Sequence, residues 1–187
     1  INQINHGPII FMCNEFFDAL PIKQIYKKNK LYFEKYVTLS NKKEIKFVYK
    51  KANNTLIKNI RDLNIVTTGN SIEYPLEAIK LLKIIAKKIN KFDGGLLTFD
   101  YGYKVKKNEN TLQSVKKHKK TKIYYKPGDS DITSHVNFKL FHEILKKNNL
   151  KVKKITNQNE FLEKIGILER ANIVSKKMTF KEKANLF

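Results

Sequence analysis

The chain has 187 residues, of which 41% are hydrophobic, so it is long and apolar enough for one domain with a substantial core. No apolar run approaches the ~20 residues that cross a bilayer, and the amino end lacks a signal-peptide pattern, so we expect neither a membrane span nor secretion. Cys13 is the single cysteine, which excludes an internal disulfide and a cysteine-rich metal site and is typical of a reducing compartment.

A formal net charge of +21 suggests a nucleic-acid partner, because dense lysine and arginine displace counterions from phosphate. Only Arg61 and Arg170 are arginines, however, and bidentate recognition of bases and phosphates usually depends on arginine. The lysines are also spread along the whole chain instead of forming one stripe. We therefore favour a solvated basic surface, with a basic module for nucleic acid or an acidic partner as the alternative.

The first predicted element is a strand from Ile9 to Cys13, whose unbroken apolar run is typical of a strand buried on both faces of a parallel sheet. Polar side chains follow directly after it, namely Asn14, Glu15 and Asp18. Open α/β sheets bind ligands beyond the carboxyl ends of their strands. The sequence therefore predicts reactive groups in this segment.

An insertion at about 27–68 follows. Segments 31–39 and 44–49 are rich in aromatic and branched residues and flank a polar turn at 40–43, so they predict a β-hairpin. A weaker strand pattern covers 63–68. The insertion could form a lid or a substrate wall, or could serve packing alone.

The clearest predicted helix opens at Ser71–Pro75 and continues to Ile89, with apolar residues at three- and four-residue spacing. Gly94–Gly95 ends this unit and leads into a second buried strand over 96–99, which completes an α/β crossover. Asp100, Tyr101 and Tyr103 follow that strand. A carboxylate after a strand is also a common turn former or helix cap, and this alternative applies to both strand ends.

The remaining chain contains shorter predicted elements. Segment 104–110 is a polar loop, Pro127–Gly128 marks a turn, and Asn137 can cap a helix over 138–147. A strand near the sheet edge (150–155), a short helix (158–165) ending at Gly166, and a helical tail (171–187) complete the prediction. Asp129, Asp131 and His135 could contact a substrate, but the turn and the capped helix already explain them, and we favour that structural interpretation.

Several catalytic classes receive no support from the sequence. The histidines His6, His118, His135 and His142 have no ligand-like spacing with carboxylates or cysteine, so no metal site is predicted. There is no G-x-S-x-G nucleophile motif, and the glycine pair at 94–95 precedes a strand instead of following one.

In combination, the motifs resemble the MidA-like family of S-adenosylmethionine-dependent methyltransferases, whose mitochondrial member is the arginine methyltransferase required for assembly of respiratory complex I. The matching segments occur in family order: NEFFDALPI at 14–22, IEYP at 72–75, GGLLTFDYGY at 94–103, TLQSVKKHK at 111–119, PGDSDITSHVNF at 127–138 and NEFLEKIGI at 159–167.

The resemblance implies an α/β fold, namely the carboxyl-terminal part of a class I, Rossmann-like methyltransferase sheet with the β-hairpin insertion. Residues 1–187 would form a single partial domain, because the family's glycine-rich cofactor loop should lie upstream of Ile1. Such a fragment would be inactive alone. Asn110 and Asn137 replace the glycine and aspartate that many members have at these positions.

The resemblance also implies roles for individual residues. Asn14 and Glu15 would lie at the methyl-donor end of S-adenosyl-L-methionine, and Glu15 and Asp18 would be catalytic. Substrate contacts would come from Asp100, Tyr101, Tyr103 and His135.

The implied activity is protein-arginine N-methylation of a respiratory complex I subunit, in the mitochondrial matrix or, for a bacterial protein, the cytoplasm. No specific nucleic acid and no membrane are expected as partners. The alternatives are a catalytically inactive methyltransferase-fold protein and the basic binding module.

Overall fold

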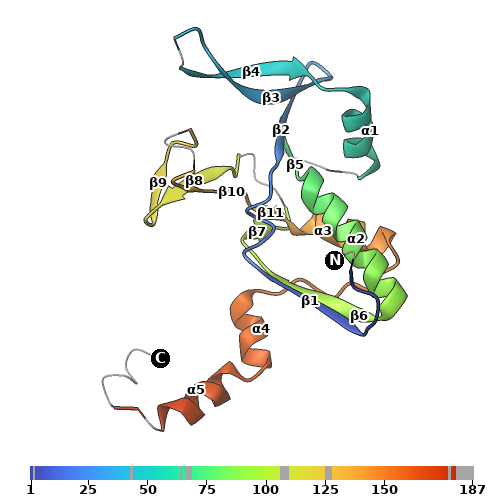
Figure 1. Cartoon of the computed structure of the whole chain (residues 1–187), viewed down its shortest axis with the longest axis vertical. Coiled ribbons are helices and arrows are strands. Elements are labelled where there is room, and N and C mark those ends of the chain that lie inside the picture. The colour runs from blue at the N-terminus through green and yellow to red at the C-terminus, as the bar shows by residue number, and fades with distance from the viewer. Residues whose placement is uncertain are drawn as a thin grey trace. The chain divides into compact units, whose positions relative to one another are not determined.

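The computed structural model describes residues 1, 3–42, 44–63, 65, 69–105, 110–124, 128–176 and 178–179. The chain forms two compact units, residues 1–152 and residues 153–187, each described by itself below (Figure 1). The first unit contains both predicted buried strands and all the predicted site residues. No helix within the described ranges is long and apolar enough to span a membrane.

Two parallel strands carry predicted site residues at their carboxyl ends. β1 (Ile9–Asn14) pairs in parallel with β6 (Gly94–Phe99), with Ile9 opposite Gly94 and Asn14 opposite Phe99. The predicted strand, insertion, helix and strand order is confirmed, because helix α2 (Leu76–Phe92) precedes β6. The carboxyl ends of the two strands therefore meet at the same edge.

The prediction that β1 is buried on both faces was wrong. Phe11 and Cys13 pack against the core, but Ile10 is 74% exposed and Met12 is 72% exposed. Alternate side chains of a strand point to opposite faces of the sheet. Only the face that carries Phe11 and Cys13 is covered by the described residues.

Glycine is required where β1 and β6 begin to pair. Gly94 has φ +128°, and a Cβ added there would lie 1.7 Å from the carbonyl oxygen of Ile9. Any side chain at this position would force the two strands apart. Gly95, the next residue, has no atom within 4 Å of an added Cβ.

The insertion forms a larger sheet than the predicted hairpin. Its four antiparallel strands lie in the order β4-β3-β2-β5. Their bounds are β2 (Lys23–Lys28), β3 (Leu31–Leu39), β4 (Ile45–Lys51) and β5 (Ser71–Tyr74). The β3–β4 hairpin was predicted, whereas β2 was not. β5 was predicted as the start of a helix, but pairing with β2 holds Ile72 and Tyr74 in a buried strand, and the helix begins after Pro75.

Helix α1 (Asn54–Asp62) was also missed by the sequence pattern. The side chain of Asn53 caps it by accepting the backbone N–H of Leu56 at 2.7 Å. Leu63 ends this helix, which contradicts a strand there. Positions 64 and 66–68 of the predicted strand lie outside the described residues.

The core is built around α2. Five of the apolar residues predicted at helical spacing are buried: Ile79, Leu82, Ile85, Ala86 and Ile89. Leu76, also predicted, is half-buried, and Ala78 is buried without having been predicted. The helix packs against β1, β6 and α3 (Phe138–Lys147). α3 contributes a second buried face: Leu140, Phe141 and Ile144. Its predicted cap is confirmed, because the Asn137 side chain accepts the N–H of Leu140 at 3.0 Å.

Several short strands follow β6 in the chain. β8 (Gln113–Lys116) lies between β9 (Lys119–Thr121) and β10 (Asp131–Thr133), and β11 (Val136–Asn137) pairs in parallel with β7 (Gly102–Tyr103). The basic run after Val115 is thus partly a β-hairpin. Residues 106–109 of the predicted polar loop, and Pro127 of the predicted turn, lie outside the described residues.

The described part of the second unit contains two short helices. α4 (Gln158–Lys164) matches the prediction, and Gly166 with φ 90° separates it from α5 (Ile167–Ser175). The predicted strand at 150–155 is absent, because this segment has no strand partner within the described ranges. α5 begins before the predicted tail, whose residues 177 and 180–187 lie outside the described part.

Candidate active site

Asp100, at the carboxyl end of β6, organises the turn that follows β1. Its Oδ2 accepts the backbone N–H groups of Phe16, Phe17 and Asp18 at 3.2, 2.9 and 3.3 Å, and its Oδ1 accepts the N–H of Tyr101 at 2.9 Å. These are the contacts of a turn former, the alternative role that the sequence left open. A substrate contact by Asp100 stays a prediction.

Asp18 is a buried carboxylate within this turn, close to the half-buried Asp100. It is 7% exposed, and its Oδ1 is buried without a hydrogen-bond partner among the described residues. Desolvation and, after it, the charge of Asp18 raise the pKa of Asp100, although backbone N–H groups oppose this shift. The two carboxylates therefore interact, and among the described residues the backbone donors gather on Asp100.

Asn14 and Glu15 are both exposed at the end of β1. The N–H of Glu15 donates to the carbonyl oxygen of Phe99 at 2.9 Å, which continues the strand pairing by one residue. Glu15 has φ 45°, a left-handed conformation that costs a non-glycine residue on the order of 1 kcal/mol and is typical of functional turns.

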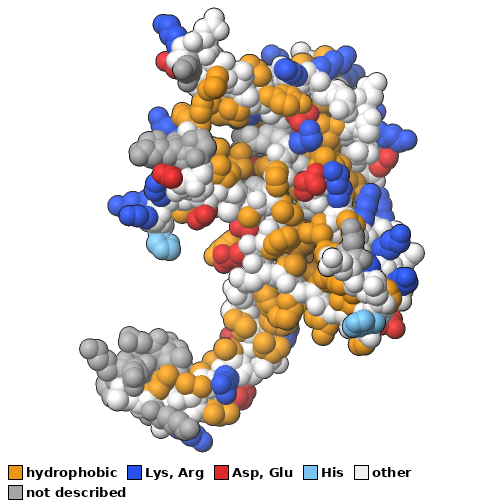
Figure 2. All heavy atoms as spheres, viewed as in Figure 1, with side chains coloured by type: hydrophobic (Ala, Val, Ile, Leu, Met, Phe, Trp, Pro, Cys, Tyr) orange, Lys and Arg blue, Asp and Glu red, His pale blue; other side chains and the backbone are white. Residues whose placement is uncertain are grey.

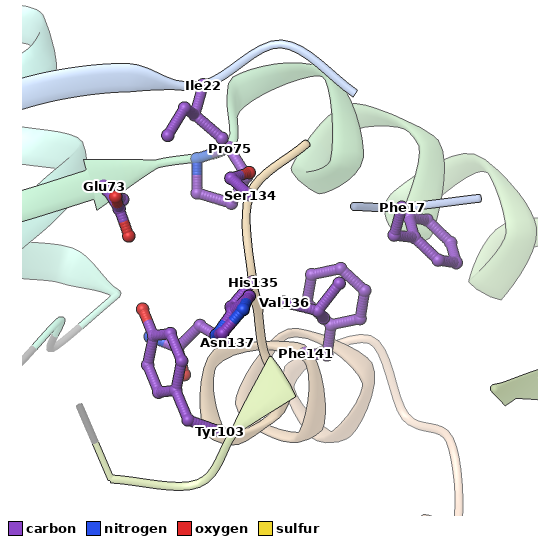
Figure 3. A pocket seen from close by; sticks show the side chains of 10 residues that line it. All are labelled: Phe17, Ile22, Glu73, Pro75, Tyr103, Ser134, His135, Val136, Asn137 and Phe141. Carbon is purple, nitrogen blue, oxygen red and sulfur yellow. The ribbon is translucent and has the colours of Figure 1, made fainter. Parts of the chain in front are cut away.

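A small pocket lies beside this turn (Figure 3). It is lined by Phe17, Ile22, Glu73, Pro75, Tyr103, Ser134, His135, Val136, Asn137 and Phe141. The structure thus brings together Tyr103 and His135, two of the residues predicted to contact a substrate. Neither Asp100 nor Tyr101 lines this pocket, and Tyr101 is 61% exposed.

Glu73 is the acidic residue of this pocket, and sequence analysis missed it. It is 5% exposed, and its two carboxylate oxygens accept the backbone N–H of Thr111 at 2.7 Å and the Thr111 hydroxyl at 2.8 Å. The same hydroxyl accepts the N–H of His135 at 2.9 Å. The IEYP motif at 72–75 contains Glu73, but the helical pattern that follows the motif predicted the start of a helix there.

Tyr103 faces the same pocket as Glu73 (Figure 3). Burial, followed by the negative charge of Glu73, raises the pKa of the Tyr103 phenol well above its ordinary value. The hydroxyl therefore keeps its proton at every physiological pH. It can donate to an acceptor, while the ring provides a flat wall.

The extended segment Ser134–Val136 joins the pocket to the strand-end turns. The N–H of Ser134 donates to the carbonyl oxygen of Asp18 at 2.9 Å, and the N–H of Val136 donates to that of Tyr101 at 2.8 Å. The turn that contains Asp18 and the pocket that contains His135 are therefore parts of one hydrogen-bonded site. Asp129, from the same predicted motif, instead pairs with Lys116 at 2.9 Å.

Residues 1–156 match the profile of a protein family described as "Putative S-adenosyl-L-methionine-dependent methyltransferase". The chain belongs to this family. The family resemblance drawn from the motifs is thereby confirmed, and S-adenosyl-L-methionine is the cofactor of the family.

Curated relatives of this methyltransferase family member include mitochondrial proteins named protein arginine methyltransferase NDUFAF7. The Caenorhabditis elegans homologue is 30% identical over 172 residues, which are 91% of this chain and 40% of the relative. The Xenopus tropicalis protein is 26% identical over 181 residues, 95% of this chain and 41% of the relative. The chain thus spans about two fifths of the length of these relatives.

Two solved structures from Burkholderia thailandensis share the fold. The first is an uncharacterised protein that superposes with a TM-score of 0.80 at 20% sequence identity. The match covers 100% of this chain and 52% of the chain of that protein. The second protein, which is bound to S-adenosyl-homocysteine, superposes with a TM-score of 0.76 at 20% sequence identity. This match covers 97% of this chain and 49% of the chain of that protein. The predicted α/β, Rossmann-like fold class is confirmed by this similarity.

Proposed function

We propose that this chain serves the S-adenosyl-L-methionine-dependent N-methylation of arginine side chains in a protein substrate. The observation that carries the proposal is the carboxylate of Asp18, which is buried with Oδ1 lacking a donor in the described structure. A buried acceptor without a donor is costly, so it is suited to a ligand that brings N–H groups. The relatives named as protein arginine methyltransferases support the same substrate class.

A guanidinium ion matches such an acceptor. It stays protonated in proteins and carries five N–H donors in one plane, so its recognition requires oxygen acceptors and a flat surface. Asp100 accepts four backbone N–H groups, whereas Asp18 Oδ1 accepts none within the described residues. Of the two carboxylates, Asp18 and Asp100, we therefore assign Asp18 to binding the substrate guanidinium.

The adjoining pocket supplies the remaining contacts. Tyr103 would place its ring against the planar cation, and the imidazole of His135 lines the same pocket. Glu73 adds a negative charge to the same wall. Phe17 and Phe141 lie edge to face with ring centroids 4.9 Å apart and form the apolar side of the pocket.

Asn14 and Glu15 would hold the cofactor. Both are exposed at the carboxyl end of β1, and an amide and a carboxylate suit the polar and cationic groups of S-adenosyl-L-methionine. When bound, the cofactor supplies a methyl group carried by a positively charged sulfonium. Glu15 would orient the guanidinium and accept the proton that the methylated nitrogen loses.

The substrate protein and its location are further proposals. By family resemblance, the methylated protein would be a respiratory complex I subunit, with an assembly role. The mitochondrial names of the relatives support the matrix as the location in a eukaryotic cell.

The test is methylation of arginine-containing and lysine-containing peptides by the whole protein, read by mass spectrometry. Asp18→Asn should lower kcat on arginine peptides by roughly a hundredfold with the fold retained. Asp131→Asn, which changes an exposed carboxylate, is the matched control and should retain activity. Unchanged turnover by Asp18→Asn would remove Asp18 from the mechanism. Methylation of lysine alone would refute the assigned substrate class.

A further inference from the structure

The β3–β4 hairpin carries an exposed apolar face, and none of its residues lines the pocket of the candidate active site. Cross-strand pairing places Val37 opposite Phe47 and Leu39 opposite Ile45, so these four side chains share one side of the ladder. Val37 is 63% exposed, Leu39 64% and Phe47 41%. We call this side, which also includes Lys35 and Tyr49, the hairpin face. Figure 2 shows hydrophobic side chains gathered on the hairpin next to lysines.

The aromatic rings of the hairpin face are held by neighbours. The Nζ of Lys35 lies 4.1 Å from the ring centroid of Phe47, and Phe47 meets Tyr124 at an angle with ring centroids 6.2 Å apart. Tyr49 meets Tyr26 edge to face at 5.3 Å. These contacts fix the rings, so little side-chain entropy is lost when a partner binds.

The hairpin face is bordered by an open strand edge. In the described part of the chain, β3 is the only strand paired with β4. β4 contains Lys46, Lys50 and Lys51 and no acidic residue. An edge strand has unpaired backbone groups that can pair with an extended peptide, and lysines on it discourage pairing with a like-charged chain.

We propose that β4 and the hairpin face bind an extended segment of a partner protein that alternates acidic and apolar residues. The segment would add a strand beside β4, placing its apolar side chains against Ile45 and Phe47 on the hairpin face and its carboxylates near Lys46 and Lys50 on the opposite face. This partner interaction goes beyond methyl transfer and does not depend on it.

Charge and ring geometry favour this occupant over two others. A second copy of the chain would bring its own Lys46 and Lys50 against the same edge, in a molecule of net charge +21. Single-stranded nucleic acid needs open ring faces for stacking, but Lys35 already covers Phe47, and the Nζ of Lys50 lies 5.5 Å from the ring centroid of Tyr36.

The experiment measures fluorescence anisotropy of the whole protein with a labelled peptide that alternates glutamate with valine. Lys46→Glu/Lys50→Glu should weaken binding by about tenfold or more, because both charges at the edge are reversed. The control Lys83→Glu/Lys87→Glu makes the same charge change on the exposed side of α2 and should alter binding little. If the two double variants weakened peptide binding equally, the effect would come from the net charge of the protein and the proposal would be overturned.

Two further probes separate the site from its alternatives. Phe47→Asp should abolish binding of the same peptide, because Phe47 lies on β4 beside the added strand. A peptide N-methylated at alternate residues should fail to bind, since it cannot pair with β4. Tighter binding of labelled oligothymidylate than of the peptide would overturn the proposal in favour of nucleic acid. A dimer in sedimentation that Lys46→Glu/Lys50→Glu alters would overturn it in favour of a second copy.

Discussion

The carboxylate of Asp100 accepts the backbone N–H of Phe17 at 2.9 Å, across 83 positions of the chain. This contact joins the ends of β6 and β1 and places Phe17 in the wall of the pocket. The turn after β1 thus owes its shape to a side chain from the neighbouring strand. The same turn contains Asp18, so the candidate active site depends on Asp100 even without a substrate contact.

Asp100→Ala should lower the free energy of unfolding by about 2–3 kcal/mol, because it leaves several backbone N–H groups of the turn without their acceptor. Chemical denaturation measures the change. Asp62→Ala, which removes an exposed carboxylate at the end of α1, should have an effect within about 0.5 kcal/mol. An equally small effect of Asp100→Ala would show that the turn forms without this carboxylate.

Asp100 should also give the protein a characteristic pH dependence. Its pKa is raised in the folded state, so the folded protein binds this proton more tightly than the unfolded chain. Its contribution to stability is therefore fully present below the ordinary carboxyl pKa and decreases as pH rises through the raised value. Urea denaturation from pH 4 upward should show a smaller decrease for Asp100→Asn than for the unaltered protein.

Asp18→Asn tests how much the charge of Asp18 contributes to this pH dependence of stability. Removing the Asp18 charge removes one of the two causes that raise the pKa of Asp100. The pH-dependent decrease should therefore become smaller while Asp100 is still present. An unchanged pH profile would attribute the shift to desolvation alone.

Gly94→Ala should destabilise the protein by about 3 kcal/mol or more, because the new Cβ would overlap the carbonyl oxygen of Ile9 and φ is positive. Gly95→Ala is the matched control, since its Cβ would meet no atom within 4 Å. Thermal or chemical denaturation compares the two. Similar stabilities for both variants would contradict the close approach of β1 and β6.

Thr111→Val should lower the free energy of unfolding by about 1–3 kcal/mol, because it removes the hydroxyl that donates to Glu73 and accepts from His135. Thr38→Val makes the same chemical change at an exposed position of β3 and should be nearly neutral or slightly stabilising. Denaturation curves of the two variants decide the result. A neutral Thr111→Val would show that the pocket wall does not depend on this network.

The features predicted correctly from the sequence depend on local patterns. The α2 face is read from the spacing of Leu82, Ile85 and Ile89, and the α3 cap from Asn137 directly before Phe138. The β3–β4 hairpin follows from its polar turn and branched residues. Each involves residues close in the chain, where helix and strand periodicity alone determines which side chains share a face.

The tertiary structure decided what surrounds these elements. Whether Ile10 is buried depends on how many layers cover β1, and Ser71–Tyr74 forms a strand because β2 pairs with it. Glu73 became a site residue through Thr111, 38 positions away, and Asp100 became a turn former through Phe17. Sequence by itself determined the α2 and α3 helices, the β3–β4 hairpin and the acidic strand ends. Only folding determined which carboxylates find donors, because a hydrogen bond requires atoms within about 3 Å, and chain separation does not predict that distance.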